Sequence, residues 1–135
     1  FKRSGEGIMA HKYIREIIDL KNTPYGWSEN TGRDLNWVEQ RRIYGFDERE
    51  TWALDSSFFY WLYERLRMYD EINCIDTSFH KFQIEDKELT QQECIDEMLS
   101  LCKEIITQRI SDEERVNKQD KVMKIWSTCY YSMWW

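Results

Sequence analysis

The chain has 135 residues and a formal net charge of −6 at pH 7, from 25 acidic and 19 basic residues. This length predicts a single domain, and one proline with only five glycines predicts long helices joined by few turns. The acidic balance excludes binding through a nucleic-acid backbone, which requires Lys and Arg beside the phosphates. No stretch approaches the ~20 apolar residues that a membrane-spanning helix requires.

The first 45 residues predict two helices and a loop. Residues 1–7 form a loose leader, and residues 9–21 form a short amphipathic helix. Residues 22–32 contain Pro24 and two glycines, which predicts a loop. Residues 33–44 predict a second helix, ended by a glycine as many helices are. Its inward side is expected to hold Leu35, Val38 and Ile43, with Trp37 near the edge.

The stretch from residue 52 to residue 72 has the densest apolar content of the chain. Its sequence, WALDSSFFYWLYERLRMYDEI, places apolar side chains around most of a helix, which is typical of a helix at the centre of a bundle. Asp47 and Glu50 have capping-box spacing, which predicts the start of this helix. Asp55 lies in the apolar stripe, so we expect a buried carboxylate that is hydrogen-bonded or paired.

The second half predicts an irregular segment followed by two helices. Residues 73–89 are expected to form an irregular excursion packed on the helices through three apolar anchors, Phe79, Phe82 and Ile84. Capping-box patterns at Thr90 and Ser111 predict one helix to about residue 110 and another to the last residue. The expected core faces are Ile95, Met98, Leu99, Cys102, Ile105 and Ile106 in the first, and Val116, Met123, Trp126, Tyr130 and Met133 in the second.

These elements together predict an all-α fold. The chain 1–135 is expected to form one domain, a small bundle of about five helices with the aromatic helix 52–72 at its centre. The four cysteines form no C-x-x-C pair, so we interpret them as reduced thiols in a cytosolic protein.

Motifs for catalysis or metal binding are weak. Neither His11 nor His80 has the surroundings of a base that activates a nucleophile, and one Cys and one His near Asp76 do not make a zinc site. Glu93 and Asp96 have the spacing of the magnesium ligands in helical nucleotide pyrophosphatases, but acidic residues in a first helical turn explain them more simply. We therefore expect no metal and no cofactor.

Aromatic residues at the two ends of the chain are better candidates for binding. The tail YYSMWW cannot turn all its rings toward one core, so some are exposed, covered by a partner, or folded back as a lid. Exposed Trp and Tyr near Arg are typical of interface hot spots. The candidate partner- or ligand-binding residues are Trp27, Trp37, Arg41, Arg42, Tyr131, Trp134 and Trp135.

The segment RRIYGFD at 41–47, followed by WALD at 52–55, resembles a group of small uncharacterised bacteriophage and prophage proteins. Those proteins combine an arginine-containing turn, an acidic cap, a W-x-L/I-D motif and a long helix. Met98 and the tryptophans from 126 onward resemble their later helices, whereas Cys94 stands where a Trp is common. The resemblance implies a phage gene whose product acts in the bacterial cell or the virion, and it brings no known activity.

We therefore expect a non-enzymatic phage-derived interaction protein that contacts a bacterial host protein in the host cytoplasm, for example as an inhibitor of a defence effector. Two alternatives remain open. One is a protein that binds and sequesters a nucleotide or other small ligand through aromatic faces and Arg41 or Arg42. The other is a magnesium-dependent helical nucleotide pyrophosphatase. The aromatic tail is also compatible with a homodimer.

Overall fold

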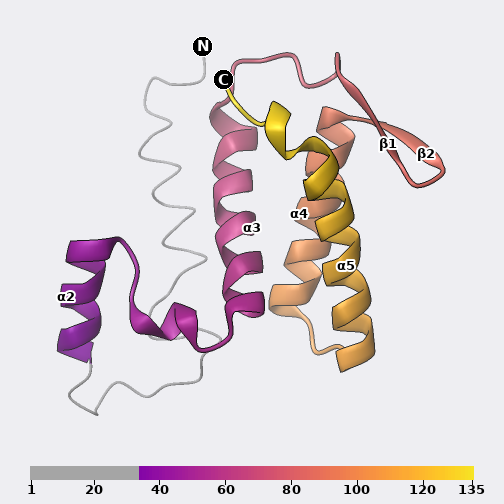
Figure 1. The fold of residues 1–135 in the computed structure, drawn as a ribbon. Coiled ribbons are helices and arrows are strands. Elements are labelled where there is room, and N and C mark those ends of the chain that lie inside the picture. Colours follow the sequence, from indigo (N-terminus) through magenta and orange to yellow (C-terminus); the bar gives the residue numbers. More distant parts are fainter. Residues whose placement is uncertain (1–33) are drawn as a thin grey trace.

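The computed structural model describes residues 34–135, and this part of the chain is mainly helical (Figure 1). Its α-helices are α2 (Asp34–Tyr44), α3 (Leu54–Ile72), α4 (Gln91–Thr107) and α5 (Asp112–Cys129). The 3-10 helices η1 (Glu48–Thr51) and η2 (Tyr130–Ser132) follow α2 and α5, and the strands β1 (Lys81–Ile84) and β2 (Lys87–Thr90) lie between α3 and α4. The predicted leader at 1–7, helix at 9–21 and loop at 22–32 lie outside the described residues.

Helix α4 packs against both α3 and α5 and is the central helix of the described bundle. Its start is fixed by a capping box: the Thr90 hydroxyl accepts the Glu93 N–H at 3.1 Å, and the Glu93 carboxylate accepts the Thr90 N–H at 3.0 Å. At the start of α5, the Ser111 hydroxyl accepts the N–H of Glu114 at 3.1 Å. Both helix starts predicted from the sequence are therefore confirmed, although both helices end earlier than expected.

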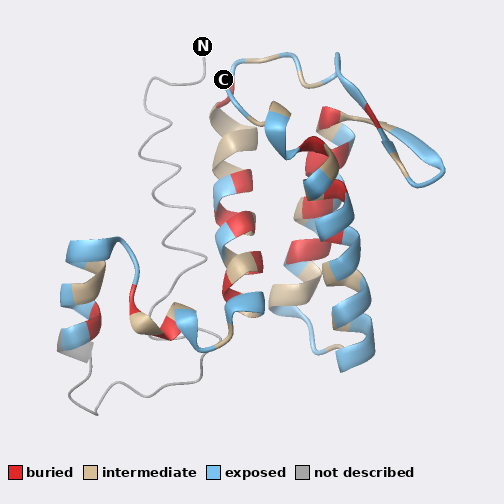
Figure 2. Ribbon diagram, in the orientation of Figure 1, coloured by how far each residue is buried: buried red, intermediate tan, exposed pale blue. Residues whose placement is uncertain are grey.

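The buried core lies where α3, α4, α5 and β1 meet (Figure 2). It consists mostly of aliphatic and sulfur-containing side chains, with two phenylalanines. Its members are Phe59, Leu62, Leu66, Phe82, Cys94, Ile95, Met98, Leu101, Cys102, Val122, Ile125 and Cys129. Burying this apolar surface is the main force that holds the three long helices together.

The prediction that residues 52–72 are buried on nearly every side is wrong. Trp52 is 40% exposed, Leu54 is 68% exposed and Trp61 is 39% exposed. Asp55 is exposed as well, and the capping box of Asp47 and Glu50 opens η1 rather than α3. The large rings can remain at the surface because α4, whose contacts lie on both sides, supplies much of the core.

The segment 73–89, predicted to be irregular, contains most of a β-hairpin. Strands β1 and β2 pair antiparallel, with Phe82 opposite Leu89. Alternation along KFQI buries Phe82 and half-buries Ile84, while Lys81 and Gln83 face solvent. Glu85 has a φ of +56°, the left-handed conformation that a two-residue hairpin turn uses. Phe82 and Ile84 are anchors as predicted, two residues apart as in a strand, whereas the prediction for Phe79 is wrong because its side chain is 75% exposed.

The buried side of α5 differs in part from the predicted one: Trp126 packs against the core as predicted, but most of the buried residues are others. Val122, Ile125 and Cys129 are buried, whereas Val116 is 51% exposed and Met123 is 42% exposed. The reason is that α5 packs on β1 as well as on α4, which turns a different face of the helix inward.

Helix α2 also turns a different side inward than predicted. Val38 and Ile43 are more than half exposed, and Trp37 is only 2% exposed. The side chain of Leu35 lies outside the described residues. Gly45, at a φ of +84°, ends the helix as expected.

Candidate interaction surface at the aromatic tail

Large aromatic side chains are exposed over the last six residues. Trp134 is 70% exposed, Tyr131 is 67% exposed, Tyr130 is 54% exposed and Trp135 is 40% exposed. We call these four residues the aromatic tail surface. Exposed Trp and Tyr side chains are enriched at protein interfaces, so these four residues are the candidate interaction surface.

Ring contacts connect this surface to α5 and to the hairpin. The ring centroids of Trp126 and Tyr130 are 5.9 Å apart, and Tyr130 meets Tyr131 edge-on at 6.2 Å. Tyr131 in turn meets Phe82 edge-on at 6.2 Å. Such contacts are favourable beyond the area they bury, so they hold the rings in defined positions.

Hydrogen bonds from α3 and α4 fix the backbone of the tail. Gln91 is fully buried, and its Nε2 donates to the Ser132 carbonyl at 3.2 Å and to the Tyr69 hydroxyl at 3.3 Å. The Tyr69 hydroxyl donates to the Trp134 carbonyl at 3.2 Å. Burial raises the pKa of Tyr69, which keeps this hydroxyl a donor. Met133 packs partly against the core, so the tail is both anchored and exposed.

The anchoring residues were not found from the sequence. Gln91 is 41 positions from Ser132, and Tyr69 is 65 positions from Trp134. No local pattern connects residues so far apart in the chain. A polar residue directly after the Thr90 cap is the one available signal, and it carries no information about its distant partners.

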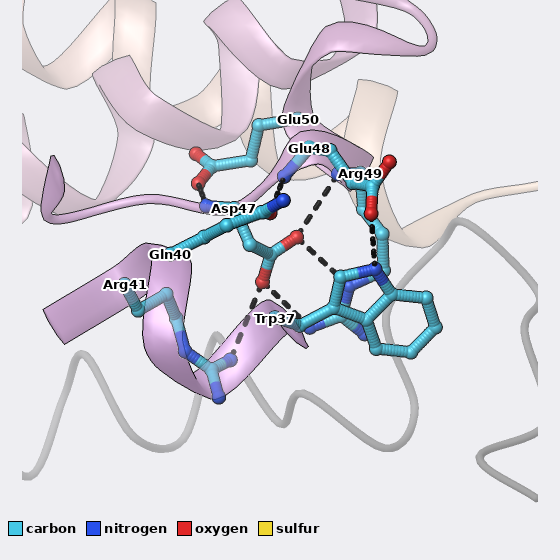
Figure 3. Close-up of polar contacts among 7 residues, drawn as sticks. All are labelled: Trp37, Gln40, Arg41, Asp47, Glu48, Arg49 and Glu50. Carbon is cyan, nitrogen blue, oxygen red and sulfur yellow. Dashed lines mark hydrogen bonds and ion pairs between the residues drawn. The ribbon is translucent and has the colours of Figure 1, made fainter. Parts of the chain in front are cut away.

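A second polar cluster lies between α2 and η1 (Figure 3). Arg49 is buried, and its Nε and Nη2 donate to the two carboxylate oxygens of Asp47 at 3.0 and 2.8 Å. Its guanidinium also lies 4.2 Å from the centroid of the Trp37 ring. Burial by itself would raise the pKa of Asp47, but hydrogen bonds from Arg49 and the charges of Arg49 and Arg41 outweigh it and lower that pKa.

This arrangement changes the interpretation of the residues near α2. The Trp37 ring is not available as a surface contact, because it is buried and its Nε1 donates to Glu48 at 3.2 Å. Arg41 faces the Asp47 carboxylate at 3.4 Å, and Arg42 donates from Nε to Glu39 at 3.1 Å. Both arginines are thus engaged by carboxylates. Trp27 lies outside the described residues.

The candidate residues therefore do not form one surface. Tyr131, Trp134 and Trp135 lie at the end of the bundle where the chain ends, whereas Arg41 and Arg42 lie on α2, at the far side of the molecule (Figure 1). Of these tail residues, Tyr131 contacts Phe82, which is a buried core residue as predicted.

Candidate metal and catalytic residues have structural partners of their own. The Glu93 carboxylate is used by the α4 cap, which lowers its pKa, and Asp96 accepts a hydrogen bond from Gln92 at 3.0 Å. Asp76 accepts the backbone N–H of Ser78 at 3.0 Å. Within residues 34–135, no three His, Cys, Asp or Glu side chains gather closely enough to hold a metal ion.

No protein-family model, curated protein or solved structure matches this chain. Among residues 34–135, none of the helices combines the length and the apolar character needed to cross a membrane.

Proposed function

We propose that the protein is a non-enzymatic interaction protein that binds a partner protein through the aromatic tail surface. The observation that carries this proposal is the exposure of Tyr131 and Trp134, at 67% and 70%, on a backbone that Gln91 and Tyr69 hold in place. Tyr and Trp dominate interface hot spots because they bury a large area with few rotatable bonds.

Preorganisation supports this role. Ordering a loose segment on binding costs free energy, and a segment that is already hydrogen-bonded avoids much of that cost. The tail carbonyls of Ser132 and Trp134 are bonded to the bundle, and the rings of Tyr130 and Tyr131 contact each other. The exposed rings of the tail can therefore contribute to affinity without a further cost for ordering the segment.

Charge and resemblance guide the choice of partner. A net charge of −6 favours a partner with a basic surface, because opposite potentials speed association. The resemblance of residues 41–55 to phage proteins favours a bacterial host protein, met in the host cytoplasm or delivered with the virion. In this proposal the protein acts by occupying that partner, for example by inhibiting a defence effector.

The test compares the wild-type chain with a Tyr131→Ser, Trp134→Ser double variant as bait in a bacterial lysate. Tyr44→Ser is the matched control, since Tyr44 is 66% exposed but lies at the end of α2. The partner should be retained by wild type and by the control. Its affinity, measured by calorimetry with the purified partner, should fall at least ~30-fold for the double variant, as expected for a lost hot spot of about 2 kcal/mol.

Equal binding by the double variant and the wild type, at unchanged melting temperature, would contradict the proposal. Size-exclusion chromatography with light scattering tests the alternative that a second copy of the chain covers this surface. A dimer that dissociates only in the double variant would assign the aromatic tail surface to a second copy of the chain instead of a host protein.

A further inference from the structure

A cleft of about 410 Å³ lies where the start of α3, the end of α4 and the first turns of α5 meet. This volume is in the range of small-molecule sites, ~300–1,000 Å³. Its lining combines aromatic, aliphatic and polar groups, among them Trp52, Ser56, Tyr60, Ile106, Gln108 and Arg115. None of these residues belongs to the aromatic tail surface, so the cleft is independent of the proposed function.

Two aromatic rings form one side of the cleft. Ser56 and Tyr60 lie one helical turn apart on α3, and Trp52, just before the helix starts, lines the same cleft. The Tyr60 hydroxyl donates to the Ile106 carbonyl at 3.5 Å, and Trp52 meets Trp37 edge-on at 6.4 Å. Rings that are held in this way suit stacking against a flat heteroaromatic ring.

Arg115 supplies the charge. Arg115 lies one turn after the start of α5, and its Nη1 forms a salt bridge with Asp112 at 2.8 Å. This bridge restricts the orientation of the guanidinium. The side chain is 37% exposed and Asp112 is 98% exposed, so the bridge is weak and the remaining N–H donors of the fork can serve an anion. Arg is the side chain best matched to the geometry of a phosphate.

We propose that this cleft binds a nucleoside monophosphate, with the base beside Trp52 and Tyr60 and the phosphate on Arg115. The hydroxyl of Ser56 and the amide of Gln108 lie in the same lining and can hydrogen-bond the edge of the base. Within residues 34–135 the cleft lining holds one arginine, and this together with the net charge of −6 favours a small, singly phosphorylated ligand over a polynucleotide.

The test titrates the full chain with AMP, adenosine and ribose 5-phosphate by calorimetry. AMP should bind at least tenfold more tightly than either fragment, since each fragment keeps only one of the two contacts. Arg115→Gln should weaken AMP about tenfold, which is 1.4 kcal/mol, and leave adenosine unchanged. Trp52→Leu should weaken AMP and adenosine by similar factors.

Arg109→Gln is the matched control, because Arg109 is exposed in the link between α4 and α5 and does not line the cleft. It should leave the affinity for AMP unchanged. Thermal melts and the amide spectra of each variant establish that the fold is kept, and chemical shifts of the Trp52 indole report ligand at the site itself. Absence of AMP binding at millimolar concentration overturns the proposal, as does equal weakening by Arg115→Gln and Arg109→Gln.

Discussion

Replacing Glu64 with glutamine is expected to stabilise the protein at neutral pH by about 3 kcal/mol. Glu64 lies on α3 and is only 5% exposed. Burial raises the pKa of its carboxyl from 4.5 to about 7; the nearby Arg65 charge opposes the rise and the Glu50 charge adds to it. At 1.36 kcal/mol per pH unit, the gap between these two values gives the expected magnitude.

The sign of the pH dependence of stability follows from whether the folded or the unfolded chain holds the Glu64 proton. Below pH 4.5 the Glu64 carboxyl is neutral in both the folded and the unfolded chain, and its ionisation costs nothing. Between pH 4.5 and about 7 the unfolded chain loses the proton while the folded chain keeps it, so the free energy of unfolding falls as pH rises. Above about pH 7 the penalty is complete and constant.

The assay is urea denaturation of wild type and Glu64→Gln between pH 4 and pH 8, with Glu97→Gln as the control because Glu97 is exposed on α4. Wild type and Glu64→Gln should have similar free energies of unfolding at pH 4, and the difference between them should grow until about pH 7. Parallel stability curves across this range would refute the reasoning, because they would mean that Glu64 ionises as freely in the folded state as in the unfolded one.

Other residues give sharp outcomes. Asp47→Ala should destabilise the protein by ~3–5 kcal/mol in urea because it removes the carboxylate paired with the buried Arg49 guanidinium, whereas Glu39→Gln, at an exposed pair, should leave the urea curve nearly unchanged. Iodoacetamide should modify Cys74 alone in the native protein, since it is the one exposed cysteine of the four; mass spectrometry showing equal labelling of the others would contradict this burial pattern. Thr90→Ala should lower the melting temperature by removing about 1 kcal/mol of capping energy from α4, and an unchanged melt would argue against the capping box.

Local chemistry made part of the fold predictable. Helix caps involve residues only a few positions apart, so they can be predicted from the local sequence. This holds for the starts at Thr90 and Ser111 and for the end of α2 at Gly45. The same holds for the buried face of α4, where the predicted Ile95 and Met98 are fully buried. These features identify a mainly helical chain without reference to distant contacts.

Other features depend on what each element packs against. The richest aromatic stretch suggested a hub, yet Trp61 remains at the surface and fully buried Cys94 belongs to the core. Composition reports how apolar a helix is, but the number of neighbours it meets decides how much of it is covered. For the same reason Val116 was predicted to be buried but is 51% exposed, and the burial of Val122 was not predicted.

The sequence by itself determined where α4 and α5 start, where α2 and α3 end, that the tail carries more rings than one core can take, and that the chain is acidic. The tertiary structure decided which rings are exposed, because that depends on Gln91 and Tyr69 reaching the tail from other helices. It also brought Trp52, Tyr60 and Arg115 to one cleft. Capping and periodicity are short-range interactions, whereas burial and the assembly of a site arise only when segments far apart in the chain exclude water from one another.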